Sequence, residues 1–541
     1  MIGGRYVHRR RAFLKRAATA VGGAAVVVAG GVNAAETINV PEDYDTIEAA
    51  VNAASDGDRI EVAEGTYETR TLHIGKAITL VGDPGNEDTG PGDNAPIVVP
   101  MNPGHKAGVE LAGPHGSPGT GTRVSGFEFR DFEWRAIGGG NGADDIVVSD
   151  NRFTDLGRGV TTFGDGREHV NWTIRRNEIE NTHQGISLTN TRSTIVEENQ
   201  ITGEGSAGIK VSPDGSDFQI GVKDVTIADN RITGPDYGVY LLARNDADPS
   251  ETVELQDVVV RNNVVSGAAE IGYRFSVGGS FDTGVSTRDV VYEGNVATDS
   301  KLGFRLDTQI DDGVSRVTYR RNEVRDVEVG LRIACEGADA DTVPASDVML
   351  ASNTIEDTGF IGIDILPRVG TISDVTVHDN RVTDVPNGLV LRPEADGKLE
   401  SVDATENRIA YSGSGVRTIG TGEAEFKNVE LLRNEIVDNE VVGVHMIGVA
   451  PEVTLRENVI AGNAKWGAYN DDDRLLDAVE NYWGAPNGPE RPLPGGGSNR
   501  TRGEAGLPDE LPEPNERRKT VGDGDRVSEG IDVTPWLSQK P

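Results

Sequence analysis

Short stretches of alternating apolar and polar residues recur along most of the chain. Each unit contains an asparagine, an apolar residue two positions later, and a glycine soon afterwards. The unit at residues 224–241 reads DVTIADNRITGPDYGVYL. Twelve intervals separate 13 such asparagines and together span 330 residues, so the mean repeat is 27.5 residues. These residues are Asn151, Asn177, Asn199, Asn230, Asn263, Asn295, Asn322, Asn353, Asn380, Asn407, Asn434, Asn458 and Asn481.

The alternation predicts strands of four or five residues with one apolar face. A single short strand cannot bury that face, so successive units must stack on one another. Helical-hairpin repeats would place apolar residues at i, i+3, i+4 and i+7, and four-stranded propeller blades need longer repeats. The repeat therefore predicts a solenoid whose coils each hold two or three short strands. Asparagine suits the turn because it tolerates the left-handed conformation and can hydrogen-bond to its neighbours in a ladder.

This repeat resembles that of the right-handed parallel β-helix proteins, the pectin-lyase-like superfamily, over nearly the whole chain after residue 35. Residues 38–82, with Gly65-Thr66-Tyr67 and Ile78-Thr79-Leu80-Val81-Gly82, look like the start of such proteins. There a short amphipathic helix, here residues 46–54, would cover the open end of the core, which is otherwise an unpaired sheet edge. The resemblance implies an all-β fold with a short capping helix.

The C-terminal part resembles the closing motif of exported β-helix proteins, among them the periplasmic accessory proteins of nitrous oxide reductase maturation. The residues concerned are Asn481-Tyr482-Trp483-Gly484, Gly488-Pro489 and Ile531-Asp532-Val533-Thr534-Pro535-Trp536-Leu537. The stretch between them is rich in Gly, Pro and charged residues, which predicts a loop or linker. We therefore expect a β-helix over residues 36–484, a loop or linker over 485–530 and a C-terminal clasp over 531–541.

The first 35 residues resemble a twin-arginine export signal. Arg9-Arg10-Arg11-Ala12-Phe13-Leu14-Lys15 precedes an apolar run from Ala17 to Val32, which is shorter than the roughly 20 residues that span a bilayer. Val32-Asn33-Ala34-Ala35 offers a small-residue cleavage site. This indicates export to the extracellular space or cell surface, with an uncleaved membrane anchor as the alternative.

Composition narrows the range of partners. The 541 residues include 52 basic and 88 acidic side chains, a net charge of -36, and removing residues 1–35 would make it -42. Nucleic-acid binding is therefore not expected, because it depends on cations that neutralise phosphates. The acidic excess, with few lysines, resembles the composition of haloarchaeal proteins. The single cysteine, Cys335, excludes an intramolecular disulfide and is expected to pack in the core.

Stacking converts one position of the repeat into a line on the surface. We define the stripe as the residues two positions after each turn glycine, which alternation directs outward. Five of the twelve are Lys or Arg, and stacked cations repel one another, so an anionic counterpart is expected. Residues 212–222, 243–256, 276–287 and 334–345 are longer connections just after the stripe and would wall a groove. The stripe is Thr161, Ser187, Lys210, Tyr240, Arg274, Arg305, Arg332, Asp364, Val390, Arg417, His445 and Tyr469.

Two interpretations of the stripe remain open. In one, its cations and tyrosine bind carboxylates or sulfates of a substrate, a chemistry that suits the arginine fork. In the other, the arginines pair with nearby carboxylates, namely Asp307, Glu336 and Asp364, and only support the fold. The candidate substrate-binding residues are Lys210, Tyr240, Arg274, Arg305, Arg332 and Arg417.

The β-helix resemblance also implies candidates for catalysis. Lyases of this fold pair an Arg or Lys base with Ca²⁺, and hydrolases pair two carboxylates. No catalytic motif fixes these roles here. Asp471-Asp472-Asp473 could bind Ca²⁺ or form a solvated acidic turn, and the eight histidines lack the spacing of a zinc or copper site. The candidate catalytic residues are Arg305, Asp307, Arg332, Glu336, Asp364 and His445, the last expected on an exposed strand.

Function does not follow from fold alone. The favoured hypothesis is an exported β-helix protein that binds or processes an acidic polysaccharide in a groove along the solenoid. If it is an enzyme, it would be a lyase, a glycoside hydrolase or an epimerase. The alternative is a non-catalytic surface or adhesion protein whose stripe only supports the fold.

Overall fold

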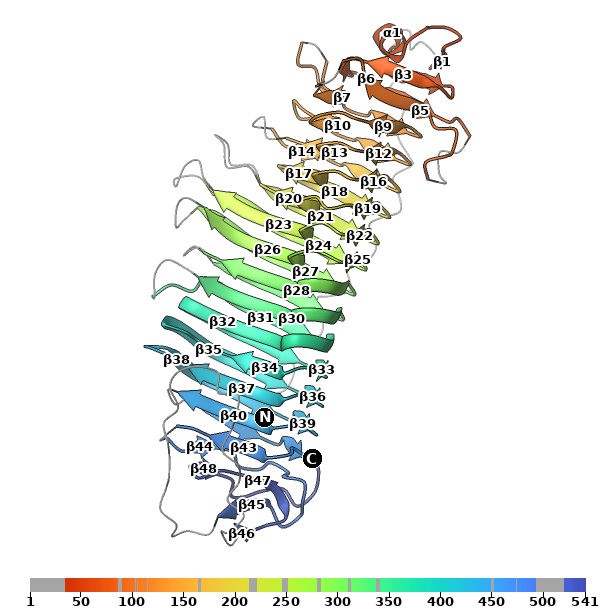
Figure 1. The fold of residues 1–541 in the computed structure, drawn as a ribbon. Coiled ribbons are helices and arrows are strands. Elements are labelled where there is room, and N and C mark those ends of the chain that lie inside the picture. Colours follow the sequence, from red (N-terminus) through yellow and green to blue (C-terminus); the bar gives the residue numbers. More distant parts are fainter. Residues whose placement is uncertain are drawn as a thin grey trace, which may run out of the picture.

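The chain forms a long rod of stacked coils with the capping helix at one end (Figure 1). The computed structural model describes residues 35–85, 90–102, 104, 106–113, 115–163, 167–213, 221–245, 252–279, 284–309, 313–336, 341–448, 452–472, 474–492 and 520–541. The predicted export signal, residues 1–35, lies outside these ranges except for its last residue. No helix in the described part of the chain is long and apolar enough to cross a membrane.

Each coil contributes to three parallel stacks of strands, with register that pairs equivalent residues of successive coils. The stack that carries the stripe comprises β4 (Leu72–His73), β7 (Ala107–Leu111), β10 (Arg135–Gly139), β13 (Arg158–Thr162), β17 (Gln184–Thr189), β20 (Ala207–Ser212), β23 (Tyr237–Asn245), β26 (Ile271–Gly279), parts of β28 (Val296–Thr308), β30 (Glu323–Glu336) and β32 (Thr354–His378), β34 (Asn387–Leu391), β37 (Ser414–Gly420), β40 (Val442–Gly448) and β43 (Trp466–Asn470).

The second stack precedes the repeated asparagines. It comprises β1 (Thr37–Val40), β2 (Arg59–Val62), β5 (Thr79–Gly82), β8 (Arg123–Ser125), β11 (Val147–Ser149), β14 (His169–Val170) with β15 (Thr173–Arg175), β18 (Thr191–Glu197), β21 (Val222–Ala228), β24 (Val253–Arg261), β27 (Val285–Glu293), β29 (Val314–Arg320), β31 (Ala345–Ala351), the end of β32, β35 (Asp396–Thr405), β38 (Glu425–Leu432), β41 (Val453–Arg456), β44 (Leu476–Asp477) and β48 (Ile531–Asp532).

The third stack follows the asparagines. It comprises β3 (Thr66–Thr69), β6 (Ile97–Pro100), β9 (Glu128–Arg130), β12 (Arg152–Thr154), β16 (Glu178–Glu180), β19 (Gln200–Thr202), β22 (Arg231–Thr233), β25 (Val264–Ser266), the starts of β28, β30 and β32, β33 (Arg381–Thr383), β36 (Arg408–Ala410), β39 (Glu435–Val437) and β42 (Val459–Ala461).

The repeated asparagines form the predicted ladder. Asn353 is typical: its backbone N–H and its Nδ2 both donate to Oδ1 of Asn380, at 3.0 and 2.9 Å, and Nδ2 also donates to the carbonyl of Tyr319. The same links join all thirteen residues from Asn151 to Asn481, and each is at most 3% exposed. A buried amide with all its hydrogen bonds satisfied is stabilising rather than costly.

One detail of that prediction is wrong. The ladder asparagines themselves do not adopt the left-handed conformation; the residue before each of them does, as Asp150, Asp229 and Asp379 show with φ of 59°, 56° and 54°. The asparagine is selected for its hydrogen bonds into the next coil, and the preceding residue makes the bend.

Both ends of the apolar core are covered. The predicted capping helix is present as α1 (Ile47–Ala53), whose N-cap Thr46 accepts a hydrogen bond from Ala49 N, and Ile47, Ala50 and Val51 are buried. One hydrophobic cluster runs from Ile38 to Val533. The core is therefore continuous along the rod.

The C-terminal segment continues the stack. Within the stretch that the sequence assigns to a loop or linker, β45 (Pro489–Pro492), β46 (Thr520–Val521) and β47 (Gly524–Arg526) form a small sheet, and residues 493–519 lie outside the described ranges. In β47, Asp525 accepts hydrogen bonds from the backbone N–H of Gly462 and from both nitrogens of Asn463. β48, in the predicted clasp, pairs with β44.

Candidate functional site

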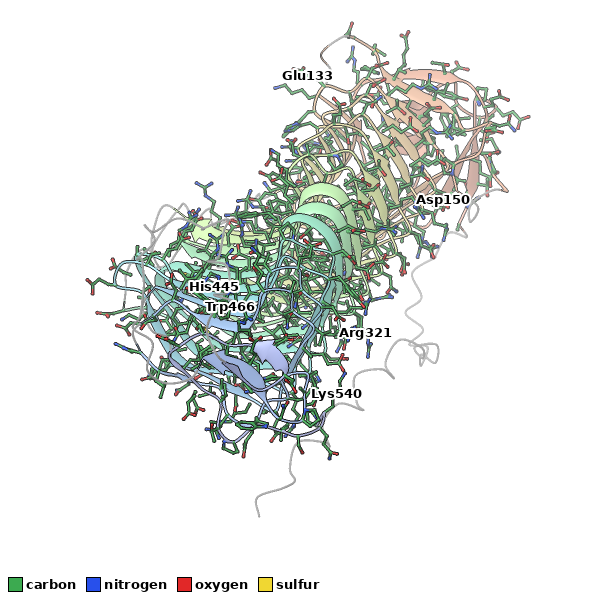
Figure 2. All side chains as sticks on the ribbon, turned by 60° about the horizontal axis from the view of Figure 1, so that its bottom comes forward. Glu133, Asp150, Arg321, His445, Trp466 and Lys540 are labelled. Atoms are coloured by element: carbon green, nitrogen blue, oxygen red, sulfur yellow. The ribbon has the colours of Figure 1, made fainter. Side chains whose placement is uncertain are left out.

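The stripe is a continuous line of paired residues. Each member lies opposite the next in a parallel pair of strands, from Thr161 opposite Ser187 to His445 opposite Tyr469. The line extends in the N-terminal direction through Gly138 and Glu110 to His73. Side chains cover the outer surface of the whole rod (Figure 2). The environment of the stripe, however, changes along its length.

In the centre of the stripe, a buried carboxylate neutralises two arginines. Asp307 lies two residues after Arg305 and is fully buried. Its oxygens lie 3.2 Å from Arg305 Nε and 3.3 Å from Arg274 Nη2, and it accepts a 2.8 Å hydrogen bond from Ser276 Oγ. The two stacked cations therefore share one internal anion.

The next two coils repeat this arrangement around Asp364, which is itself a stripe residue and is also fully buried. Arg332 Nε donates to its Oδ2 at 2.7 Å, and Arg392 binds both oxygens at 2.7 and 2.8 Å. Burial opposes the charge of Arg392, but the hydrogen bonds and charges of Asp364 and Glu394 together outweigh burial, so the pKa of Arg392 is raised.

Outer carboxylates complete the network. Glu336 lies 3.7 Å from Arg305 and accepts from Arg368 at 3.3 Å, and Glu394 accepts from Arg368 and Arg392. In the described structure, five arginines and four carboxylates thus meet in one cluster, which we call the central ion-pair cluster. It matches the interpretation in which the arginines pair within the protein.

Tyr240 takes part in the same network. The Arg274 guanidinium lies 5.0 Å from the centre of the Tyr240 ring and 5.1 Å from that of Tyr237, within the range of cation–π attraction. This predicted aromatic platform is therefore partly occupied by an arginine of its own chain.

Toward the C-terminus the stripe is buried. Val390 and Arg417 are 2% and 6% exposed, and Arg417 Nη1 donates to Asn387 Oδ1 at 2.9 Å. The expectation that His445 is exposed is wrong, because it is 2% exposed and packs edge-on against Tyr469. Burial, reinforced by the charge of Arg417, lowers the pKa of His445 to about 3, so its imidazole is neutral at physiological pH.

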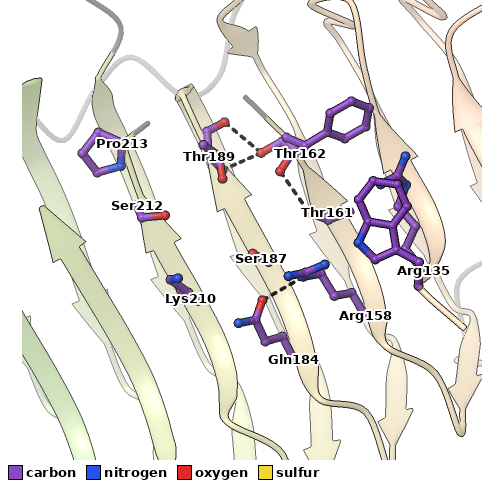
Figure 3. Close-up of a pocket in the computed structure, with 12 residues that line it drawn as sticks. Arg135, Arg158, Thr161, Thr162, Gln184, Ser187, Thr189, Lys210, Ser212 and Pro213 are labelled. Carbon is purple, nitrogen blue, oxygen red and sulfur yellow. Dashed lines mark hydrogen bonds between the residues drawn. The ribbon is translucent and has the colours of Figure 1, made fainter. Parts of the chain in front are cut away.

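At the N-terminal end, the stripe lines an open pocket of about 290 Å³ (Figure 3). Arg158, which begins β13, and Lys210 point into it, together with the hydroxyl-bearing residues Thr161, Ser187 and Ser212. The hydroxyl groups of the threonine and serine side chains donate and accept hydrogen bonds without carrying charge. Trp134 and Phe163 also line the pocket and contribute aromatic rings.

This pocket has an excess of positive charge. Arg158 donates to the uncharged Gln184 at 2.9 Å, and no described carboxylate lies within 4 Å of either Arg158 or Lys210. Burial is the main cause that lowers the pKa of Arg158, and the charge of Arg135 lowers it further. Burial also lowers the pKa of Lys210, with smaller contributions from the charges of Arg158 and Arg244. The cations repel one another, and a bound anion would relieve this repulsion.

Comparison with known proteins identifies the family. The family model described as "Right handed beta helix region" matches residues 116–275 and 310–481, more than half of the chain. The chain belongs to the right-handed β-helix family. Its rod of parallel coils is therefore the right-handed parallel β-helix predicted from the sequence. No curated protein matches this β-helix protein.

Several solved structures resemble this β-helix protein distantly. The catalytic domain of a GH87 α-1,3-glucanase in complex with nigerose has 14% identity and a TM-score of 0.45, over 65% of this chain and 66% of that one, just under two thirds. An exopolygalacturonase from Thermotoga maritima has 11% identity and a TM-score of 0.41, over 62% and 89%. A mannuronic acid-specific family 6 lyase from human gut microbiota has 13% identity and a TM-score of 0.41, over 81% and 87%.

The pocket contains residues that the stripe alone does not reveal. Arg158 lies three positions before Thr161 on the same strand, and Trp134 and Arg135 lie one coil earlier. The sequence does carry a signal for Arg158. It occupies the same position of the repeat as Gln184 and Ala207 in the next two coils of the β-helix, and it is the charged residue of the three. The stripe, defined by a single position of the repeat, does not include Arg158, although both Arg158 and Thr161 line this pocket.

In the described part of the chain, no group of three or more metal-binding side chains converges, so nothing there supports the calcium alternative for Asp471-Asp472-Asp473. Asp472 Oδ1 instead accepts a hydrogen bond from Arg474 N, and Asp472 N donates to Asn470. These bonds form a local turn. Asp473 lies outside the described residues.

Proposed function

We propose that this β-helix protein is exported and binds an acidic polysaccharide along the stripe, held chiefly by Arg158 and Lys210. The observation that carries the proposal is a pair of cations that have no carboxylate partner among the described residues, in an open pocket of a strongly acidic protein. In the central ion-pair cluster, by contrast, carboxylates of the protein itself neutralise Arg274, Arg305 and Arg332. At this end, no carboxylate of the described residues supplies the counter-charge, and the anionic group of a ligand would supply it.

The other groups of the pocket suit a sugar. Ser187 and Ser212 offer hydroxyl groups to match those of a saccharide, and Thr161 Oγ1, which donates to the Thr162 carbonyl, can still accept a hydrogen bond. Trp134, 41% exposed, offers an apolar ring surface beside them. A carboxylate or sulfate on the glycan would form charge-assisted hydrogen bonds with Arg158 and Lys210.

Binding is better supported than bond cleavage. Asp307 and Asp364, two of the candidate catalytic carboxylates, are fully buried and each contacts two arginines. A general acid or base must reach the substrate proton. The central ion-pair cluster also favours the second candidate, a surface protein whose stripe only supports the fold.

Binding can be tested by titration calorimetry with polyuronates, sulfated glycans and neutral glycans. We expect uronate binding that falls about tenfold or more in Arg158→Gln and Lys210→Gln, because each removes a charged hydrogen-bond donor. Arg231→Gln is the matched control, since Arg231 is exposed on β22 of the third stack. Absorbance of unsaturated sugar ends would reveal a lyase. Equal losses in all three variants, or no binding to any glycan, would contradict the proposal.

Alkaline pH provides an independent check. The pKa of Lys210 lies below its ordinary value of 10.5 in the free protein, and a bound anion would raise it. Uronate affinity should therefore be full at neutral pH and decline as the pH rises through that lowered pKa. Lys210→Arg should retain affinity at alkaline pH. A pH-independent affinity would exclude Lys210 as an anchor.

A further inference from the structure

We propose that the binding site continues past Trp134 into a second pocket, and that its ligand is an acidic oligosaccharide of several units rather than a single sugar. This inference rests on the proposed function and specifies the ligand of the same site. The second pocket has a volume of about 420 Å³, and Trp134 lines both.

Trp134 is held in a fixed position between the two pockets. The Arg135 guanidinium lies 3.6 Å from the centre of a Trp134 ring and 4.4 Å from that of Phe163. Arg135 is in turn fixed by Glu110, which accepts from its Nε at 2.8 Å and from its Nη2. The indole is therefore supported by a buried ion pair while 41% of its surface remains exposed. A rigid, exposed ring is a suitable platform for a sugar.

The second pocket also presents a cation, Lys106. Lys106 and His73 are exposed in its lining, and no described carboxylate lies within 4 Å of Lys106. The one carboxylate in that lining, Glu110, is engaged by Arg135. The two pockets together thus place Lys106 on one side of Trp134 and Arg158 with Lys210 on the other. This pattern fits a ligand with acidic groups at intervals along a chain.

The register gives the length of this surface. His73, Glu110, Gly138, Thr161, Ser187 and Lys210 lie on six successive coils. With parallel strands about 4.8 Å apart, the line is about 24 Å long. A single sugar would occupy only a fraction of it. The ligand is therefore expected to lie along the rod axis.

A single-stranded nucleic acid also combines acidic groups with rings that stack. The pocket favours a glycan over that polymer, because its lining is rich in hydroxyl groups. The net charge of -36 also opposes a ligand with a phosphate at every unit.

The test is titration of galacturonate oligomers from the monomer to the octamer, with Trp134 fluorescence as a second readout. Affinity should rise with length by about tenfold or more until the groove is filled. Lys106→Gln should weaken the longer oligomers several-fold and leave the dimer unchanged, whereas Lys210→Gln should weaken all lengths. Lys223→Gln is the matched control, since the Lys223 side chain is exposed on β21 of the second stack. The ligand-induced fluorescence change should disappear in Trp134→Phe.

The outcomes separate the two proposals. Length-independent binding that requires Lys210 and is insensitive to Lys106→Gln would overturn the extended groove and leave the proposed function intact. Absence of binding at every length would overturn the proposed function itself. Tighter binding of oligothymidylate than of any uronate oligomer would overturn the assignment to a glycan.

Discussion

A column of glycines lies next to the stripe because the coils approach each other closely there. A Cβ on Gly330 would lie 2.5 Å from the carbonyl oxygen of Gly362 and 2.6 Å from Ile355 Cγ2. The carbonyl oxygen of the glycine in the next coil would obstruct a Cβ in the same way at Gly303, Gly362 and Gly388. None of these four has a positive φ. The repeat therefore requires glycine for space rather than for conformational freedom.

This distinction predicts the effect of alanine at two nearby positions. Gly330→Ala should destabilise the protein by about 1–3 kcal/mol, because the new methyl group overpacks backbone and core atoms. At Gly359 the nearest atoms would be 3.7 and 3.8 Å from the Cβ, so Gly359→Ala should change stability by no more than about 0.5 kcal/mol. Urea unfolding of both variants measures the difference. Equal effects would refute the close-approach explanation.

The bends account for part of the acidic excess. Among the described residues, 36 other than glycine have positive φ, and 17 of these are aspartates. Aspartate adopts the left-handed conformation more readily than most residues because its short side chain can hydrogen-bond locally. A composition that resembles adaptation to salt therefore also reflects the geometry of the coil.

At the scale of the strand, one stripe combines two chemical environments. In the central ion-pair cluster, Asp307 and Asp364 lie beneath the arginines, whereas the described residues include no such partner for Arg158 and Lys210. The first arrangement stabilises the fold. The second arrangement places two positive charges in a partly buried pocket where no described carboxylate neutralises them. Such a site lowers the stability of the fold, which is typical of functional sites.

Substitutions should distinguish these environments. Arg332→Gln removes one of the two arginines bound to the buried Asp364, so we expect a loss of about 1.5–3 kcal/mol in unfolding free energy. Lys210→Gln relieves repulsion with Arg158 and Arg244 and should leave stability unchanged or slightly higher. Calorimetric unfolding measures both. A larger loss in Lys210→Gln than in Arg332→Gln would reverse the assignment of the two environments.

The sequence predicts repeated features better than particular partners. The Asn ladder and the alignment of the stripe were predictable because each depends on one position of a regular repeat. Pairing of Arg332 with Asp364 belongs to one of the two interpretations of the stripe. The second arginine on Asp364 was not predictable, since Arg392 lies beyond the end of β34 and reaches back to the preceding coil. The pocket was missed for a similar reason: Trp134 and Arg135 belong to a coil before the first stripe residue, and their roles depend on contacts across coils.

At the scale of the whole molecule, stacking multiplies any charge placed at a bend. Four successive coils place an exposed aspartate at the same left-handed bend. These residues are Asp299, Asp326, Asp357 and Asp384. At a separation of about 4.8 Å, neighbouring charges repel by about 0.9 kcal/mol even at the dielectric constant of water. The rod therefore carries lines of like charge along its length.

These lines predict that stable folding requires salt. At molar ionic strength the Debye length falls to about 3 Å, so the repulsion between coils is strongly screened. We expect the melting temperature to rise steeply between dilute buffer and molar KCl. Asp326→Asn should raise stability in dilute buffer, by up to about 1 kcal/mol, and have little effect in molar KCl, because asparagine keeps the bend and removes the repulsion.

Asp289 provides the matched control, since it makes the same kind of bend but binds Arg316 through two hydrogen bonds of 2.7 and 2.8 Å. Those bonds lower the pKa of Asp289, so its ionised form stabilises the fold above the carboxyl pKa of the unfolded chain, and this stabilisation is lost as the pH falls. Asp289→Asn should therefore lower stability slightly in dilute buffer, by less than about 1 kcal/mol at this exposed site. If both variants shifted stability in the same direction, or the unsubstituted protein unfolded at the same temperature at every KCl concentration, repulsion between stacked bends would not govern its stability.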